Sequence, residues 1–305
     1  MRLLTFARDP GDTQAGVLRD DRVIAVRDLL DEPLADVGAL LQRPGALERL
    51  RAALGERADA PTVPLDEVQL LAPILRPPTI RDFVAFERHV RNAVKNQGLD
   101  EPPAFWYRTP VFYFSNPLTV HGPGAVIRCP SSTDSLDYEI EIGVVIGREG
   151  ESIPEADALD YVAGFTLFND WSARDLCMDE FGGFGLHKGK DFAQALGPWL
   201  LTTDELADRF VDGRLDLGVW ARVNGETWTE SSTRDMHWSY AHLVSFASRD
   251  SRVVPGDVIG SGTVPFGCIF ERPDEMRWLE EGDVVEIGGE RLGSTRHTVR
   301  VHADS

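Results

Sequence analysis

The chain has 305 residues, 42% of them hydrophobic and 27% charged, so it can bury one large core or two small ones. Its formal net charge of −19 argues against nucleic acid and anionic membranes as partners, because both are themselves negative. No stretch of about 18 apolar residues predicts a membrane span. The first residues also lack the apolar segment of a signal peptide, so the cytoplasm is the expected compartment.

The sequence of residues 1–72 predicts a small α+β domain. Short apolar or alternating segments predict strands at residues 3–7, 15–19 and 22–26. A helical pattern follows near residues 46–57, and the proline-containing segment 60–64 is typical of a linker.

Residues 73–305 predict a larger domain that is rich in strands. Strands are expected at residues 125–128, 137–146, 162–168, 199–202, 216–223, 253–259, 270–272 and 284–287. Helices are expected at residues 82–96, 172–179, 203–207 and 239–247. Strands do not alternate regularly with helices, and no Gly-x-Gly-x-x-Gly turn follows a strand in the required way. The predicted class is therefore α+β, without a nucleotide site.

The segment 136–147, Leu-Asp-Tyr-Glu-Ile-Glu-Ile-Gly-Val-Val-Ile-Gly, predicts a strand with two glutamates on one face. Side chains two residues apart share a face, so Glu139 and Glu141 point the same way while Ile140 and Ile142 face a core. Two like charges side by side repel each other, and they lose hydration where they are buried. A divalent cation is the simplest partner for them, and the alternative is a solvated strand face with two ordinary glutamates.

Three further polar segments follow in the chain. Asn169 and Asp170 end a predicted strand, and Arg174 comes one helical turn later. Residues 185–192, Gly-Leu-His-Lys-Gly-Lys-Asp-Phe, contain two of the three lysines in the whole chain. Residues 255–263 end in the turn Gly-Ser-Gly-Thr. Carboxylates and cations at strand ends and glycine-rich turns are typical of open sites.

These four segments, in this order and at these separations, resemble the fumarylacetoacetate hydrolase superfamily. Its motifs are a Glu-x-Glu strand, an Asn-Asp-x-Ser-Ala-Arg-Asp segment, a Gly-Lys before Asp-Phe, and a Gly-Ser-Gly-Thr turn, and the resemblance covers about residues 78–300. It implies a rolled mixed β-structure around the site, preceded by a small β-rich N-terminal domain. It also implies a homodimer.

The resemblance implies a site for Mg²⁺, Mn²⁺ or Ca²⁺. Glu139, Glu141 and Asp170 match the three carboxylate ligands of the family, and oxygen ligands suit these ions. Asp82 matches a fourth acidic ligand of some members. The alternative role for Asp82 is the N-cap of the helix predicted at residues 82–96.

A catalytic base is also implied. His89 lies seven residues after Asp82 on the same predicted helix and matches the catalytic histidine of the family, while Glu271 matches the glutamate that orients it. A carboxylate bonded to one ring nitrogen fixes the tautomer and makes the other nitrogen a better base. The alternative is a surface histidine on an amphipathic helix.

Two cations match residues that stabilise negative charge on the substrate. Lys190 lies 20 residues after Asp170 and matches the family lysine, and Arg174 matches its partner for a substrate oxygen. The alternative for both is a solvated basic side chain.

Substrate contacts are implied for Thr263, where the alternative is a turn residue, and for Tyr113, where it is a core residue. Cys177 stands where the family often has glutamine, and a thiol is a weaker hydrogen-bonding partner. With Cys129 and Cys268 it completes a set of three cysteines, which lack zinc-site spacing and are expected to be free thiols. The glycine-rich segment 181–185 is expected to form part of a loop over the site.

The implied function is a divalent-metal-dependent hydrolase that cleaves a carbon–carbon bond of a 1,3-diketo or β-keto acid, similar to fumarylacetoacetate or an acylpyruvate. The reaction would pass through a metal-held enolate. The same chemistry serves decarboxylases, isomerases and dehydratases or other lyases of 2-oxo acids, so these reactions remain alternatives. A non-catalytic, metal-dependent binding protein is a further alternative.

Overall fold

The computed structural model describes residues 1–57, 59–96, 98–181 and 185–301. Most of its strands belong to a large mixed sheet of β1 (Arg2–Ala7), β2 (Thr13–Arg19), β3 (Arg22–Ala25), β4 (Val63–Pro64), β5 (Gln69–Leu71), β6 (Ile80–Phe83), β7 (Phe112–Ser115), β8 (Val120–His121), β11 (Ile140–Ile146), β13 (Val162–Asp170), β15 (Gln194–Thr202) and β21 (Val258–Gly260). Its order is β4-β3-β2-β1-β15-β13-β11-β21-β6-β7, with β5 paired to β1 and β8 to β15.

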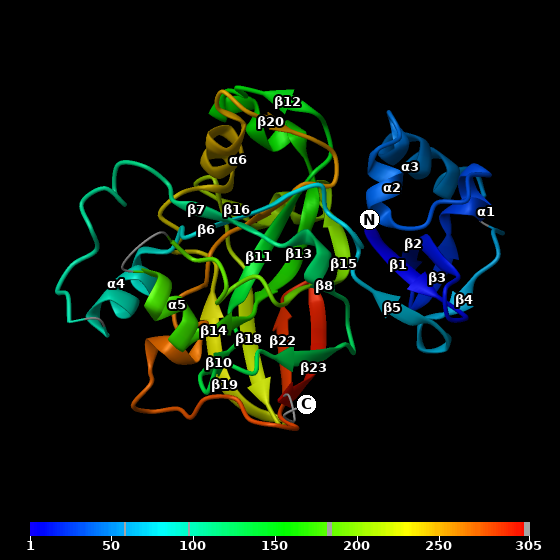
Figure 1. The fold of residues 1–305 in the computed structure, drawn as a ribbon. Coiled ribbons are helices and arrows are strands. Elements are labelled where there is room, and N and C mark those ends of the chain that lie inside the picture. The colour runs from blue at the N-terminus through cyan, green and yellow to red at the C-terminus, as the bar shows by residue number, and fades with distance from the viewer. Residues whose placement is uncertain (58, 97, 182–184, 302–305) are drawn as a thin grey trace.

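A second mixed sheet packs beside it (Figure 1) and has the order β19-β18-β22-β23-β9. Its strands are β9 (Val126–Cys129), β18 (Gly218–Val223), β19 (Glu226–Ser232), β22 (Val284–Gly289) and β23 (Gly293–Val301). Three two-stranded pairs join β10 (Leu136–Asp137) to β14 (Ser172–Ala173), β12 (Gly150–Glu151) to β20 (Arg252–Val253), and β16 (Phe210–Val211) to β17 (Arg214–Leu215). The strand-rich α+β class is confirmed.

The helices are short and lie outside the sheets. The α-helices are α1 (Val26–Leu30), α2 (Val37–Leu41), α3 (Ala46–Glu56), α4 (Glu87–Lys95), α5 (Arg174–Phe181) and α6 (Tyr240–Ser248). The 3₁₀ helices are η1 (Leu65–Glu67), η2 (Pro117–Thr119), η3 (Glu155–Tyr161), η4 (Thr203–Arg209) and η5 (Ile269–Glu271). In the part of the chain that is described, no helix combines the length and apolarity needed to cross a membrane.

Strand β11 separates the main core from the site because its side chains alternate between two faces. Ile140, Ile142, Val144 and Ile146 all belong to the main hydrophobic cluster, which also contains residues of β18, β22 and β23. On the opposite face Glu141 lines a cavity. The predicted alternation of side chains therefore places the isoleucines of this strand in the core and Glu141 in the cavity.

The N-terminal residues form a lobe at one side of the molecule (Figure 1), and this lobe shares its core with the rest of the chain. β1 pairs with β15 through Arg2 opposite Leu201 and Leu3 opposite Leu200. A second hydrophobic cluster contains Leu3 and Leu50 together with Val145, Phe168 and Leu196. The division into domains 1–72 and 73–305 remains a prediction, but burial across it is continuous.

Two predicted elements are wrong, and two predicted strands are each divided: residues 138–139 separate β10 from β11, and residues 254–257 separate β20 from β21. The helix predicted at residues 82–96 begins only at Glu87, and Asp82 lies in β6 between β21 and β7. Asp82 is therefore not the N-cap, which is Phe86, and it does not share a helix with His89. Pairing with two strands that are distant in sequence outweighs the local helical pattern there. Of the strand predicted at residues 270–272, Phe270 and Glu271 instead belong to η5, and Arg272 is its C-cap.

Candidate active site

A cavity of about 200 Å³ opens where β6, β7, β11 and the end of β13 meet α4 and α5. All of the predicted site residues line it except Glu271, which lies behind His89. Strand register brings the residues together from distant parts of the chain. Asp82 lies opposite Gly260 on one side and Tyr113 on the other.

Three buried carboxylates form the acidic centre of this cavity. Oxygens of Asp82, Glu141 and Asp170 all lie within 4.8 Å of one another. The amide of Gly262 donates to Glu141 Oε2 at 2.9 Å. The Tyr113 hydroxyl lies 2.9 Å from Asp82 Oδ2 and also bonds the Asp170 carboxylate. Tyr113, predicted to bind substrate, thus orients two of the acidic side chains.

Close packing fixes the position of Asp82. A Cβ atom on Gly260 would lie 2.1 Å from Asp82 Oδ1, a distance at which heavy atoms overlap. Only glycine at this position therefore leaves room for the carboxylate. Pairing with β21 places Asp82 opposite Gly260, and the missing Cβ of that glycine gives the carboxylate space to enter the acidic centre.

The electrostatics of this centre favour a divalent cation. Burial and the charge of Asp170 raise the pKa of Asp82 well above its usual range, and burial with the charges of Asp82 and Asp170 does the same for Glu141. Burial also raises the pKa of Asp170, although Lys190 opposes this. Among the described residues, Asp82 Oδ1 and Asp170 Oδ1 are buried without a hydrogen-bond donor. Oxygens that are buried, close together and unpaired fit Mg²⁺, Mn²⁺ or Ca²⁺.

Glu139 lies beside this centre and binds two cationic side chains. Its Oε1 accepts from Arg174 at 2.6 Å, and its Oε2 accepts from Lys190 Nζ at 2.5 Å. Burial alone would raise the pKa of Glu139, but the charges of Arg174 and Lys190 outweigh burial and lower it. The structure thus groups Asp82, rather than Glu139, most closely with the other two carboxylates. A ligand role for Glu139 remains a prediction.

Both cations are buried and paired. Lys190 Nζ also bonds the Asp170 carboxylate, and Arg174 Nε donates to Asp137 Oδ2 at 2.8 Å. Burial alone would lower the pKa of Lys190, but the charges of Asp170 and Glu139 outweigh burial and raise it, so the ammonium is charged. Lys190 and Arg174 are therefore not solvated basic side chains, which was the alternative for both. The guanidinium of Arg174 forms its hydrogen bonds with Glu139 and Asp137.

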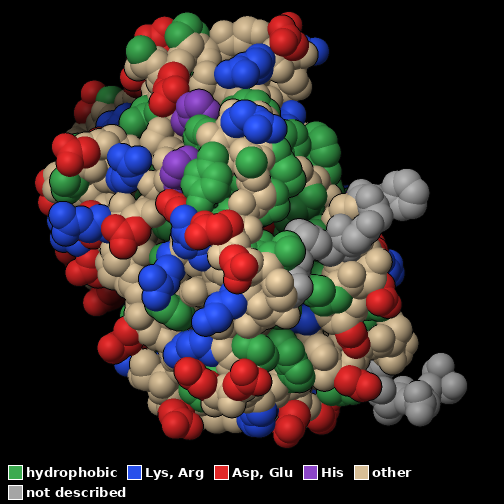
Figure 2. All heavy atoms as spheres, turned by 90° about the vertical axis from the view of Figure 1, so that its left-hand side faces the viewer, with side chains coloured by type: hydrophobic (Ala, Val, Ile, Leu, Met, Phe, Trp, Pro, Cys, Tyr) green, Lys and Arg blue, Asp and Glu red, His purple; other side chains and the backbone are tan. Residues whose placement is uncertain are grey.

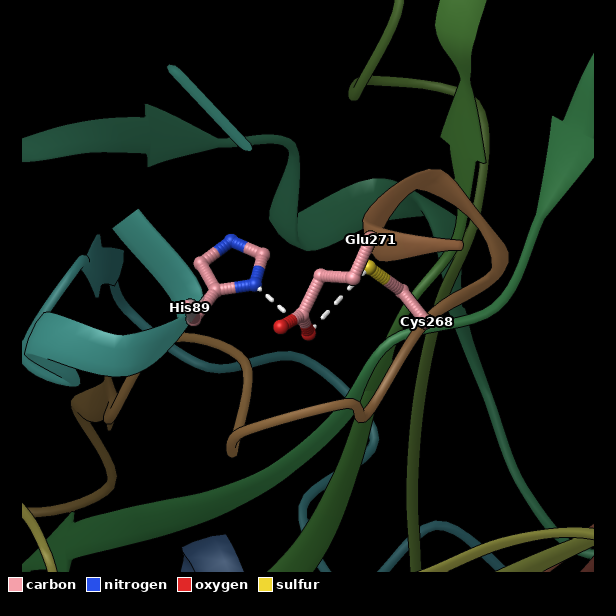
Figure 3. A group of neighbouring side chains, drawn as sticks. All are labelled: His89, Cys268 and Glu271. Atoms are coloured by element: carbon pink, nitrogen blue, oxygen red, sulfur yellow. Dashed lines mark hydrogen bonds and ion pairs between the residues drawn. The ribbon is translucent and has the colours of Figure 1, made fainter. Parts of the chain in front are cut away.

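His89 and Glu271 form a buried pair, as Figure 3 shows. His89 Nδ1 lies 3.0 Å from Glu271 Oε1, and the other ring nitrogen points away from the carboxylate. Asn92 Nδ2 donates to Glu271 Oε2 at 2.7 Å. Asn92 was not predicted, although its position one turn after His89 on α4 places it on the same helix face.

Backbone groups complete the hydrogen bonding of Glu271. The amides of Phe266 and Gly267 donate to it at 2.9 and 3.1 Å. Burial alone would raise the pKa of Glu271, but His89 and the donors from Asn92 and Phe266 outweigh burial and lower it. Cys268 also lies in this group (Figure 3), and burial raises the pKa of its thiol. Three N–H donors besides the His89 ring, from Asn92, Phe266 and Gly267, hold the Glu271 carboxylate in place. The fixed carboxylate can therefore orient the imidazole of His89.

The remaining predicted residues also lie at the cavity. Thr263 is buried and lines it, as does Cys177 at the position where the family often has glutamine. A Cβ on Gly189 would lie 2.5 Å from Cys177 Sγ, so the thiol packs against the loop that carries Lys190. Of the segment 181–185, predicted as a loop over the site, residues 182–184 lie outside the described residues.

Comparison with known proteins identifies the family. The family model described as "Fumarylacetoacetate (FAA) hydrolase C-terminal" matches residues 79–300. A Burkholderia cenocepacia protein, named as a candidate hydrolase, is 33% identical over 303 residues, covering 97% of this chain and 99% of its own.

Solved structures agree with this assignment. A probable 2-hydroxyhepta-2,4-diene-1,7-dioate isomerase from Mycobacterium abscessus has a TM-score of 0.77 at 30% identity, over 100% of both chains. Maleylpyruvate hydrolase from Sphingobium sp. SYK-6, solved with manganese(II) and pyruvate, has a TM-score of 0.74 at 22% identity and covers 99% of this chain and 100% of its own. The latter likeness shows the fold. The chain belongs to the fumarylacetoacetate hydrolase family.

Proposed function

We propose that the protein is a divalent-metal-dependent hydrolase that cleaves a carbon–carbon bond of a 1,3-diketo acid of the acylpyruvate kind. The observation that carries the proposal is the position of the oriented base. His89, bonded to Glu271, lines the same cavity as three clustered carboxylates and the buried ammonium of Lys190. The solved relative with manganese and pyruvate supports this choice of cation and substrate class.

The cation would be held by Asp82, Glu141 and Asp170, with Glu139 beside them. When bound, it would supply Lewis-acid activation of the substrate carbonyl groups. Mn²⁺, Mg²⁺ and Ca²⁺ all accept such oxygen ligands, and the donor set does not distinguish them. Glu139 contributes by holding Arg174 and Lys190 at the edge of this centre.

His89 supplies the base. Nδ1–H donates a hydrogen bond to Glu271, which leaves the unprotonated Nε2 free to remove a proton from water. The hydroxide adds to the acyl carbonyl of R–CO–CH₂–CO–COO⁻, and the bond between that carbon and the methylene then breaks. Its electron pair passes to the methylene carbon as the enolate of pyruvate, which Lys190 stabilises by its charge. Protonation of this carbon gives pyruvate, and the acyl group leaves as R–COO⁻.

The test is hydrolysis of an acylpyruvate by the Mn²⁺-loaded protein, followed by the loss of enol absorbance and by pyruvate release. Addition of EDTA should abolish turnover. His89→Ala should lower kcat by about 10²- to 10⁴-fold, the usual contribution of a general base. His242→Ala is the matched control, because His242 forms a similar 2.9 Å pair with Glu155 outside this cavity. Equal activity of both variants would refute the assignment of the base.

An isomerase or decarboxylase is the second candidate function. The Mycobacterium abscessus relative named as an isomerase favours the first of these. Decarboxylation requires neither an activated water nor a general base, so His89→Ala separates it from hydrolysis, whereas an isomerase is distinguished by a product that retains every carbon of the substrate. Decarboxylation of oxaloacetate that survives in His89→Ala, without acylpyruvate hydrolysis in the parent protein, would favour a decarboxylase. Zero turnover on a panel of oxo acids would favour a metal-dependent binding protein.

The predicted homodimer is part of the same proposal. Sedimentation of the purified protein should give twice the chain mass of 33.8 kDa. A monomer that turns over acylpyruvate at full rate would show that assembly is not required for the site.

A further inference from the structure

The part of the cavity that lies away from the acidic centre is apolar. Residues of α4 and of the segment that follows it form much of this wall, and they are Val90, Ala93, Val94, Pro103, Phe105 and Trp106. Met178 and Leu186 extend it from the α5 side. Figure 1 shows α4 and the following segment projecting to one side of the large sheet, so this wall and the carboxylates come from separate layers.

The wall continues outward to exposed apolar side chains. Phe105 is 51% exposed, Met178 is 41% exposed and Val111 is 37% exposed, yet all three line the cavity. Figure 2 views this side of the molecule and shows hydrophobic side chains gathered on it among charged ones. An apolar group that begins in the cavity can therefore extend along apolar surface towards solvent.

The positive side chains of the cavity are already engaged. Among the described residues, Arg174 and Lys190 are the lysines and arginines that line it. Arg174 binds Asp137 and Glu139, and Lys190 binds Glu139 and Asp170. The residues at positions 97 and 182–184 are glutamine, glycine and phenylalanine, so they add no basic side chain.

The basic side chains of α4 and of the segment that follows it, which are Arg88, Arg91, Lys95 and Arg108, do not line the cavity. Arg91 on α4 bonds Glu87, Glu101 and Tyr107. The guanidinium of Arg88 lies 5.3 Å from the ring centroid of Phe266. A second carboxylate held against the buried part of the wall would therefore lose its hydration without meeting a lining cation that is free to pair with it, which is unfavourable.

We infer that the substrate is a 2,4-dioxo acid whose acyl group is apolar and uncharged. The inference rests on the proposed function, and it names the substrate class of the same site. The polar 2,4-dioxo end would lie at the acidic centre, and the alkyl or aromatic end would lie against Val90, Val94 and Trp106. Burial of this end is favourable in proportion to its apolar area. This preference separates the chain from relatives named for a dioate substrate.

Binding of two 2-oxo acids of equal length tests the inference without any turnover. 2-Oxononanoate and 2-oxononanedioate differ only at the end remote from the oxo group, and neither has the 4-carbonyl that hydrolysis requires. With the Mn²⁺-loaded protein in a calorimeter, the monoacid should bind at least about tenfold more tightly. Equal binding, tighter binding of the dioate, or no binding of either acid would overturn the inference.

Turnover then separates this inference from the proposed function. 2,4-Dioxononanoate should have a kcat/KM at least about tenfold above that of 2,4-dioxononanedioate. If neither compound is hydrolysed but 2-oxononanoate still binds more tightly than its dioate, the proposed reaction fails and the apolar preference holds. If both are hydrolysed equally well, the reaction holds and the preference fails.

A cation placed on the wall should reverse the preference. Met178→Lys adds an ammonium to a side chain that is partly exposed, so the variant can fold with its charge near solvent. The ratio of dioate to monoacid binding should rise at least about fivefold in Met178→Lys and remain at the parent value in Met178→Leu. Val94→Lys is the second variant, on the buried part of the wall. Unchanged ratios in both lysine variants would overturn the placement of the distal group.

Discussion

Replacing Glu271 by glutamine should remove the orientation of the base while it keeps the shape of the side chain. The carboxylate accepts four N–H donors: Oε1 accepts from His89 and Gly267, and Oε2 accepts from Asn92 and Phe266. An amide has one oxygen and one NH₂, so in either orientation its NH₂ faces two donors. If it faces His89, Nδ1 must become an acceptor and the ring proton moves to Nε2, where the base is needed.

The stability cost follows from the same four contacts. Two hydrogen bonds to a charged group are lost, each worth about 1.5 kcal/mol or more, so unfolding free energy should fall by about 3 kcal/mol. The pKa of Glu271 is lowered in the folded protein. Its contribution is therefore present above the ordinary glutamate pKa and is lost as pH falls through the folded value. The difference between parent and variant should shrink in acid.

Two measurements check this prediction. Acylpyruvate turnover should fall by about 10²-fold or more in Glu271→Gln, and urea unfolding at several pH values should show the stability difference shrinking in acid. Glu155→Gln is the control, because Glu155 pairs with His242 at 2.9 Å but is 53% exposed, whereas Glu271 is buried. That variant should change stability by less than about 1 kcal/mol. A Glu271→Gln protein with parental kcat and an unchanged acid profile would refute the orienting role.

Four further predictions concern the acidic centre and the lysine beside it. Glu141→Gln should weaken Mn²⁺ binding by about tenfold or more in calorimetry, and parental affinity would remove Glu141 from the ligands. The pKa values of Asp82 and Glu141 are raised, so the cation-free protein should lose stability as pH rises through their folded values. The rise in Tm on adding Mn²⁺ should therefore grow with pH. A rise in Tm that is independent of pH would contradict this. Gly260→Ala should displace the Asp82 carboxylate, lower the free energy of unfolding by about 1 to 3 kcal/mol and weaken Mn²⁺ binding. A variant with parental stability and parental Mn²⁺ affinity would disprove this. Lys190→Met should leave Glu139 without one of its two cations and destabilise the cation-free protein by about 3 kcal/mol or more in urea unfolding, and no change would argue against a buried charge pair.

Much of the site could be predicted because its residues stand in strong local patterns. The alternation of glutamate and isoleucine at residues 139–142 fixes both the strand and its faces, since side-chain direction in a strand depends only on spacing. Lys190 is conspicuous because lysine is rare in this chain. These signals lie within a few residues and need no tertiary information.

Other features depend on contacts between distant segments. Asp82 occupies a four-residue strand that exists through pairing with β21 and β7, so the local sequence favoured a helix instead. Asn92 is an ordinary polar residue on α4 until Glu271 is placed beside it. The engagement of Arg174 with Asp137 and Glu139 likewise joins residues more than 30 positions apart. Local sequence contains no record of such neighbours.

The attachment of the N-terminal lobe through β15 has a consequence for how this architecture can vary. At one end β15 pairs with β1, and at its other end Gln194 donates to the carbonyl of Lys190 at 2.6 Å. A lobe remote from the chemistry thus braces the strand on which the loop with the ammonium rests. Any exchange of that lobe must bring a replacement strand, because a bare edge would invite aggregation and loosen the anchorage of the lysine.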